Sequence, residues 1–143
     1  MSSDAGDLQE AVGRFVRVFG LLQPDQTPCG QPIPASESHA LAELAREGEL
    51  RQVELARRLH LEKSTTSRLV GQLGGRGWVE RRSAPEDGRG VLVRLTPAGE
   101  QAAGRLALAR RALFQTVIDR IPEAERDGVL HALSLLIGAL DGT

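Results

Sequence analysis

The sequence predicts a mainly α-helical fold with one small β-hairpin, and three observations support this class. Apolar residues recur at helical spacing in six separate segments of the 143-residue chain. Two β-prone runs, Trp78 to Arg82 and Val91 to Leu95, bracket a stretch rich in Gly, Pro and Asp. Hydrophobic residues make up 41% of the chain and charged residues 26%, which is typical of a folded globular domain.

The composition and the first residues exclude several classes of protein. The longest apolar run, from Val129 to Leu140, is shorter than the roughly 20 residues of a membrane-spanning helix. The N-terminus carries acids where a signal peptide requires a basic start, so we expect a cytoplasmic protein that has no membrane partner. The single cysteine, Cys29, excludes an intramolecular disulfide, and we expect neither a cofactor nor a bound metal.

The first predicted helix is amphipathic and ends before Pro24. Its apolar stripe consists of Leu8, Val12, Phe15, Val16, Phe19 and Leu22. Residues 24–34 contain four prolines and a glycine, so they predict an irregular loop, in which Cys29 lies.

Three short helices are expected next. Ser36 is a suitable N-cap for the first of them, which Gly48 ends. The next extends from about Gln52 to His60 and is followed by a tight turn at residues 61–63. The third begins near Ser64 and ends at the glycines that follow residue 73. Its inward stripe consists of Thr66, Leu69, Val70 and Leu73.

Two further helices are expected after the hairpin. Thr96 and Pro97 are typical of a helix start, and this long helix ends before Pro122. The acids Glu123 and Glu125 mark the first turn of the last helix. The apolar residues of these two helices are Leu106, Leu113, Phe114, Val117, Ile118, Ile121, Val129, Leu133, Leu136, Ile137 and Leu140.

Positive charge is concentrated in the middle of the chain, although the formal net charge is −1. Residues 51–95 contain ten Lys or Arg and five Asp or Glu, a net charge of +5, and the rest of the chain carries −6. This pattern fits a polyanion-binding surface, and it also fits a solvated charged face. Both interpretations stay open for Arg57, Arg58, Arg76 and Arg82. For Arg81, an ion pair with Glu80 or Glu54 is an equal possibility.

The helices at residues 52–60 and 64–75, with the hairpin after them, form the outline of a winged helix-turn-helix. In that motif the second helix enters the major groove of DNA. Its outward face here carries hydroxyl, arginine and glutamine side chains, which can contact base edges and phosphates. These residues are Ser64, Thr65, Ser67, Arg68 and Gln72. Arg89, at the tip of the hairpin, could reach the minor groove or the backbone, so the sequence predicts binding to double-stranded DNA.

Five stretches follow one another along the chain: Glu54 to Leu59, Lys63 to Val70, Gly77 to Arg81, Asp87 to Arg89 and Leu95 to Gly99. In this order they resemble the MarR family of bacterial transcription regulators. The resemblance implies an obligate homodimer in which each winged helix contacts half of a near-palindromic operator. It implies repression that a small-molecule effector relieves. It also implies three regions: an N-terminal dimerisation helix with a connector at 1–34, the DNA-binding domain at 35–96, and C-terminal dimerisation helices at 97–143.

The resemblance further implies roles for the hairpin tip and for an effector pocket. Asp87 would support the wing through an ion pair and Arg89 would contact DNA, whereas Gly88 replaces an arginine that many relatives carry. An apolar or aromatic anion would enter a pocket between the helical region and the winged helix. The residues expected near it are Phe15, Phe19, His39 and Arg110.

Two other sensing chemistries stay open. Cys29 could act as a redox-sensitive thiol, although no Lys, Arg or His adjoins it in the sequence. The chain also has no tyrosine, whereas the peroxide-sensing relatives hydrogen-bond their reactive cysteine to tyrosines. Cys29, Glu37 and His39 are suitable zinc ligands, but the fifth helix lacks the histidine pair of the zinc-sensing relatives.

Other classes of function fit the sequence less well. An enzyme is not predicted, because the three histidines lie on separate segments without a nucleophile or an acid motif beside them. A winged helix that contacts only proteins would need neither the basic segment nor Arg89. RNA-binding modules stack bases on exposed aromatic rings. The four aromatic residues here, Phe15, Phe19, Trp78 and Phe114, are expected in the core, so DNA binding is favoured.

Overall fold

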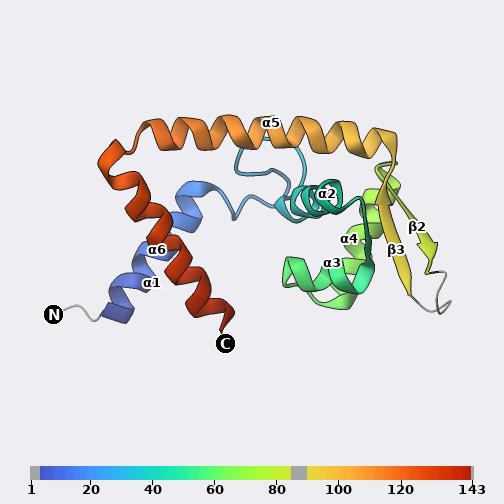
Figure 1. The fold of residues 1–143 in the computed structure, drawn as a ribbon, viewed down its shortest axis with the longest axis horizontal. Helices are drawn as coiled ribbons and strands as arrows, with labels where there is room; N and C mark the ends of the chain where they lie inside the picture. The colour runs from blue at the N-terminus through green and yellow to red at the C-terminus, as the bar shows by residue number, and fades with distance from the viewer. Residues whose placement is uncertain (1–3, 85–89, 143) are drawn as a thin grey trace. The chain divides into compact units, whose positions relative to one another are not determined.

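The computed structural model describes residues 4–84 and 90–142, which contain six helices and three strands (Figure 1). The predicted order of four helices, a hairpin and two helices is confirmed. The contacts within the chain divide it into two compact units, Met1–Ala109 and Arg110–Thr143. In the described ranges, no helix is both long enough and apolar enough to cross a membrane.

Helix α1 (Asp4–Phe19) carries the predicted apolar stripe, yet none of its residues is buried by the part of the chain that the structure describes. The helix ends where Gly20 adopts a φ of 95°, a left-handed conformation that favours glycine. The proline-rich segment after it is an irregular loop, as predicted. Ile33, near the end of this loop, packs into the core of the first unit.

Helices α2 (Ala35–Glu47), α3 (Gln52–Leu59) and α4 (Lys63–Gly75) pack around one apolar core. Leu41 and Leu44 of α2 and Leu55 of α3 are fully buried in it. The predicted inward stripe of α4 is confirmed, because its members are at most 4% exposed. They are Thr66, Leu69, Val70 and Leu73. The face of α4 opposite this stripe is therefore free to meet a ligand.

Two predicted helix caps were wrong. Ser36 does not cap α2, because Pro34 precedes the helix in an extended conformation and its carbonyl accepts the N–H of Glu37. Ser64 lies inside α4, whose N-cap is the extended residue Glu62. At both helix starts the backbone carbonyl of the N-cap residue accepts the first helical hydrogen bond, and no side chain caps the helix.

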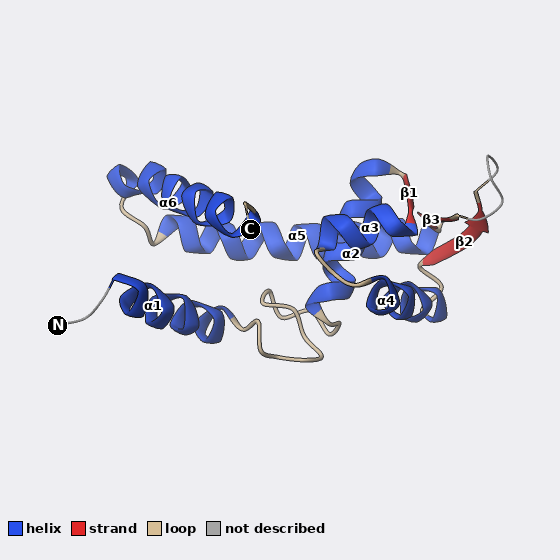
Figure 2. Cartoon of the chain, turned by 90° about the horizontal axis from the view of Figure 1, so that it is seen from below, coloured by secondary structure: helices blue, strands red, loops and turns tan. Residues whose placement is uncertain are grey.

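Strands β1 (Glu49–Arg51), β2 (Val79–Ser83) and β3 (Val91–Leu95) form an antiparallel sheet in the order β1-β3-β2 (Figure 2). Strands β2 and β3 are the predicted hairpin, paired from Val79 with Leu95 to Ser83 with Val91. Strand β1 was not predicted. It has three residues, and its pairing partner β3 lies far along the chain, so no local pattern reveals it.

Helix α5 (Pro97–Asp119) begins at the predicted residues. The Thr96 hydroxyl accepts the N–H of Gly99 at 3.0 Å and donates to the Gly77 carbonyl at 2.6 Å. Gly99 lies so close to Trp78 that an added Cβ would be 1.9 Å from the Trp78 carbonyl oxygen. The start of α5 is therefore joined closely to the segment between α4 and β2.

The second unit contains the remainder of α5 and helix α6 (Glu123–Asp141). Helix α5 ends before Pro122, as predicted. Within the described ranges α6 has no buried residue. The large apolar side chains exposed on the second unit are Phe114, Val117, Val129, Leu130, Leu133, Leu135, Ile137 and Leu140.

We predict that Gly99→Ala destabilises the protein by about 1–3 kcal/mol, because the new methyl group would overlap the Trp78 carbonyl. Gly104, in the same helix, provides a matched control, since a Cβ there would meet nothing within 4 Å. Gly104→Ala should stabilise the protein by about 0.5–1 kcal/mol. Urea unfolding at a fixed protein concentration measures both effects. Equal effects of the two substitutions would contradict the close approach at Gly99.

Candidate DNA-binding surface

The outward face of α4 presents the residues that were predicted to contact DNA. Ser64, Ser67, Arg68 and Gln72 are exposed there, and Thr65 is half-buried. Among the described residues, no side chain pairs with Arg68 or Gln72. The hydroxyls, the guanidinium and the amide of this face are the groups that contact base edges and phosphates in a major groove. The structure thus brings five predicted site residues together on one helix face.

Ser67 differs from its neighbours because a second element holds it. The Arg81 guanidinium of β2 donates from Nη2 to the Ser67 carbonyl at 2.5 Å, and the same atom lies 3.5 Å from the Ser67 hydroxyl. Its Nε donates to the side-chain oxygen of Gln52 at 3.2 Å. The ion pair of Arg81 with Glu80 or Glu54, which the sequence left open as one possibility, is therefore not formed, because Arg81 lies on the face of β2 that points toward α4.

The other four arginines left open by the sequence all form ion pairs. Arg57 and Arg58 both donate to Glu54, and Arg58 also pairs with Glu47 at 2.8 Å. The hydrogen bonds of these two arginines lower the pKa of the Glu54 carboxyl to about 2, and the bond from Arg57 has the larger effect. Since the ordinary value is higher, Glu54 stays ionised and paired in moderately acidic solution.

Two further pairs join elements that are distant in sequence. Arg82 donates to Glu49 at 2.9 Å and so connects β2 with β1, and its hydrogen bond lowers the pKa of that carboxyl. Arg76, at the end of α4, donates to the buried Glu37 of α2 at 2.7 Å. Acids outside residues 51–95 therefore neutralise part of the basic segment. Of the two cations on α4, Lys63 and Arg68, neither pairs with an acid in the described part of the chain.

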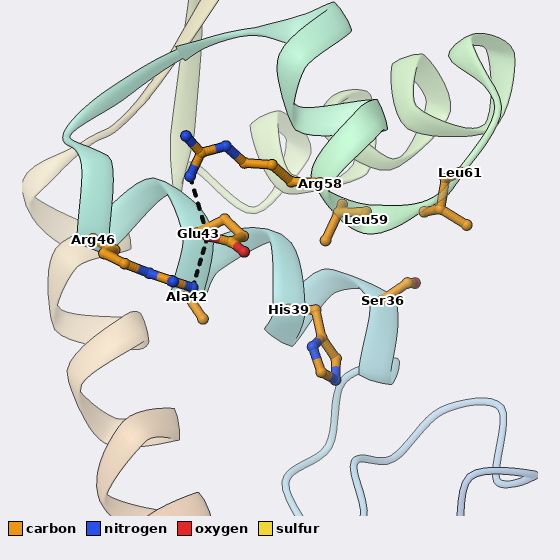
Figure 3. A pocket seen from close by; sticks show the side chains of 8 residues that line it. All are labelled: Ser36, His39, Ala42, Glu43, Arg46, Arg58, Leu59 and Leu61. Carbon is orange, nitrogen blue, oxygen red and sulfur yellow. Dashed lines mark ion pairs between the residues drawn. The ribbon is translucent and has the colours of Figure 1, made fainter. Parts of the chain in front are cut away.

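A hollow of about 320 Å³ lies beside α2 and α3 and contains His39, one of the four residues expected near an effector (Figure 3). Its charged groups already pair with one another. Oε2 of Glu43 forms ion pairs with Nη2 of Arg46 at 2.7 Å and with Nη1 of Arg58 at 3.7 Å. The other three expected residues do not line it. Phe15 and Phe19 stack on each other in α1 with ring centroids 5.3 Å apart, and Arg110 belongs to the second unit.

A second hollow has a different chemistry and was not predicted. Arg105 brings positive charge to it, whereas the charge of Arg76 is balanced by Glu37, and the Trp78 ring lies beneath the Arg76 guanidinium at 5.2 Å. Arg105 has no acidic partner among residues 4–84 and 90–142. The complete lining is Gln31, Pro32, Ile33, Arg76, Trp78, Ala102, Arg105 and Leu106. These residues come from the loop, the end of α4 and α5, so no single sequence motif marks the hollow.

Cys29 is half-buried in the loop before α2, and its Sγ lies 3.0 Å from the Thr27 hydroxyl in a hydrogen bond. The possible zinc ligands Cys29, Glu37 and His39 do not form a site. Glu37 is bound to Arg76, and within the described residues no three His, Cys, Asp or Glu side chains lie close enough together to hold a metal ion.

Two other expectations concern the hairpin tip and the aromatic residues. Asp87, Gly88 and Arg89 lie outside the residues that the structure describes. The expectation that all four aromatic residues are core residues was wrong, because Phe15 is 56% exposed and Phe114 is 49% exposed. Both belong to helix segments, α1 and the second half of α5, in which the described part of the chain buries no apolar residue.

Comparison with known proteins agrees with this arrangement. Residues 31–90 match the model of the MarR family. An HTH-type transcriptional regulator of Mycobacterium leprae is 30% identical over 140 residues, which covers 96% of this chain and 92% of that protein. The multiple antibiotic resistance protein MarR of Salmonella typhimurium is 37% identical over 67 residues, or 47% of this chain and 46% of that protein.

Solved structures share the fold over nearly the whole chain. A crystal structure of a mutant MarR from E. coli complexed with operator DNA has a TM-score of 0.73 and 26% identity, and the match covers 94% of this chain and 99% of that one. A probable transcriptional regulator from Pseudomonas aeruginosa has a TM-score of 0.73 and 25% identity, with 95% and 98% covered. The chain therefore belongs to the MarR family of transcription regulators.

Proposed function

We propose that the protein is a homodimeric repressor that binds a near-palindromic DNA operator through α4 and releases it when a small anionic effector binds. The observation that carries this proposal is the outward face of α4. Four of its five polar side chains are exposed and Thr65 is half-buried, while the opposite stripe anchors the helix in the core. Such a helix can enter a major groove without exposing apolar surface to the DNA.

Specific contacts are assigned to three residues of this face. The Arg68 guanidinium suits guanine or phosphate, and the Gln72 amide suits adenine. Ser64, at the N-terminal end of α4, suits a phosphate oxygen, because backbone N–H groups point outward there as well. The relative from E. coli that is solved with operator DNA supports this mode of binding.

The homodimer is proposed from the apolar surface that one chain leaves uncovered. Helix α1 exposes Leu8, Phe15 and Val18, and α6 exposes Leu130 and Leu140. A monomer rarely keeps so many large apolar side chains in water. Sedimentation equilibrium should therefore give twice the monomer mass. A stable monomer at micromolar concentration would contradict this part of the proposal.

We predict that Arg68→Ala weakens binding to operator DNA by about tenfold, because each good base contact contributes about 1–3 kcal/mol. The operator is first selected from random duplexes with the wild-type protein, and affinities are measured against a scrambled duplex at two salt concentrations. Arg46→Ala is the matched control, since it removes an exposed arginine of α2 that pairs with Glu43. If the two variants bind the operator equally well, Arg68 does not have the proposed role.

The effector is proposed to bind in the hollow formed by Arg76, Trp78 and Arg105. The Arg105 guanidinium, beside the Trp78 indole and the apolar Ile33 and Leu106, suits a planar carboxylate with an apolar body. Because the lining comes from the loop, from α5 and from Arg76 and Trp78, a ligand there contacts Arg76, the C-cap residue of α4. A bound anion can therefore change the position of α4.

We predict that benzoate quenches the fluorescence of Trp78, the single tryptophan of the chain, in a saturable manner. Benzamide, which has nearly the same shape without the charge, should cause little quenching. Arg105→Ala should weaken benzoate binding by about tenfold, because it removes a charge-assisted hydrogen bond. Arg46→Ala should leave the affinity unchanged. Equal quenching by benzoate and benzamide would contradict an anion site in this hollow.

A further inference from the structure

Strand β2 separates its polar side chains onto two faces. Val79 and Arg81 share the face that points toward α4, with Val79 in the core and Arg81 just beyond the core's edge. Glu80 and Arg82 point to the other face. There the Glu80 carboxylate accepts a hydrogen bond from Nε of Arg94 at 2.6 Å, and Arg82 pairs with Glu49. Neighbouring arginines of equal charge thus have different partners.

Arg81 connects three elements of the winged helix-turn-helix. Its Nη2 donates to the carbonyl of Ser67, in the middle of α4, and its Nε donates to Gln52, the first residue of α3. A helical carbonyl already accepts one bond from the residue four positions later, so Arg81 uses the second lone pair of this oxygen. The planar guanidinium holds both bonds in one geometry, which a lysine cannot do.

We infer that Arg81 is a positioning residue for DNA recognition, which fixes the recognition helix α4 relative to the hairpin strand β2. This inference rests on the proposed function and adds a residue that acts through Ser67 and its neighbours on α4. The polar face of α4 and the hairpin must fit one duplex at the same time, so a small shift between them loses base contacts. Loss of Arg81 lowers affinity for the operator more than it lowers affinity for unrelated DNA.

The alternative role for an exposed arginine beside a DNA-binding helix is a phosphate contact. A phosphate contact supports binding to any sequence, and its loss lowers the salt dependence of binding by about one counterion. Replacing an arginine that only contacts phosphate by lysine largely preserves binding, because a point charge is sufficient. Loss of a positioning residue instead weakens mainly the sequence-selective binding, and lysine does not restore it.

The experiment compares Arg81→Ala, Arg81→Lys and the control Arg82→Ala on the selected operator and on a scrambled duplex, over a series of salt concentrations. Arg82 is the matched control because it lies next along β2, carries the same charge and points to the other face of the strand, where it pairs with Glu49. We expect Arg81→Ala and Arg81→Lys both to lose about tenfold in the ratio of operator to scrambled affinity. Arg82→Ala should keep that ratio. Rescue by Arg81→Lys, or an equal ratio for Arg81→Ala and Arg82→Ala, would overturn the inference.

A second measurement tests the contact without DNA. Amide hydrogen exchange of residues 67–72 in the free protein should become about threefold or more faster in Arg81→Ala, and it should not change in Arg82→Ala. If the wild-type protein selects no DNA sequence, the proposed function fails. Hydrogen exchange then still tests whether Arg81 holds α4 in place. Unchanged exchange in Arg81→Ala would refute the positioning role even if DNA binding is confirmed.

Discussion

The buried stripe of α4 is the constraint on which the rest of the structure depends. Thr66, Leu69, Val70 and Leu73 repeat at helical spacing, and their burial fixes which side of α4 faces outward. A polar face that points outward from a rigid core is preorganised for a ligand, because binding then costs little conformational entropy. The hairpin and the start of α5 are built onto this helix through Arg81 and through the close contact of Gly99 with Trp78.

Charge in this protein acts through local pairs more than through a net field. The basic middle of the chain carries a net +5 in the sequence, yet Glu37, Glu47 and Glu49 from outside it neutralise three of its arginines. On α4, Lys63 and Arg68 are the cations that pair with no acid among residues 4–84 and 90–142. A few unpaired cations at defined positions favour sequence-selective contacts over a broad attraction to polyanions.

Local patterns predicted most of the fold, whereas contacts between distant segments were beyond them. The stripe of α4, the start of α5 at Thr96 and the hairpin all follow from spacing and from turn or capping chemistry, and the structure confirms them. Strand β1 and the partners of Arg81 depend on residues far away in sequence, so neither was predicted. The hollow at Arg76 and Arg105 was missed for the same reason, since three separate segments line it. Exposure of Phe15 was misjudged, because an amphipathic stripe does not reveal whether its cover belongs to the same chain.

The central claim is that the outward face of α4 contacts bases in the major groove. Methylation interference at guanine N7 tests it most directly, because this atom lies in the major groove. Operator duplexes are methylated sparsely, and those that still bind the protein are separated from those that do not. The account predicts interference in two clusters about one helical turn apart or a multiple of it, one for each α4 of a dimer. Selective binding with no interference at any guanine within the operator would contradict it.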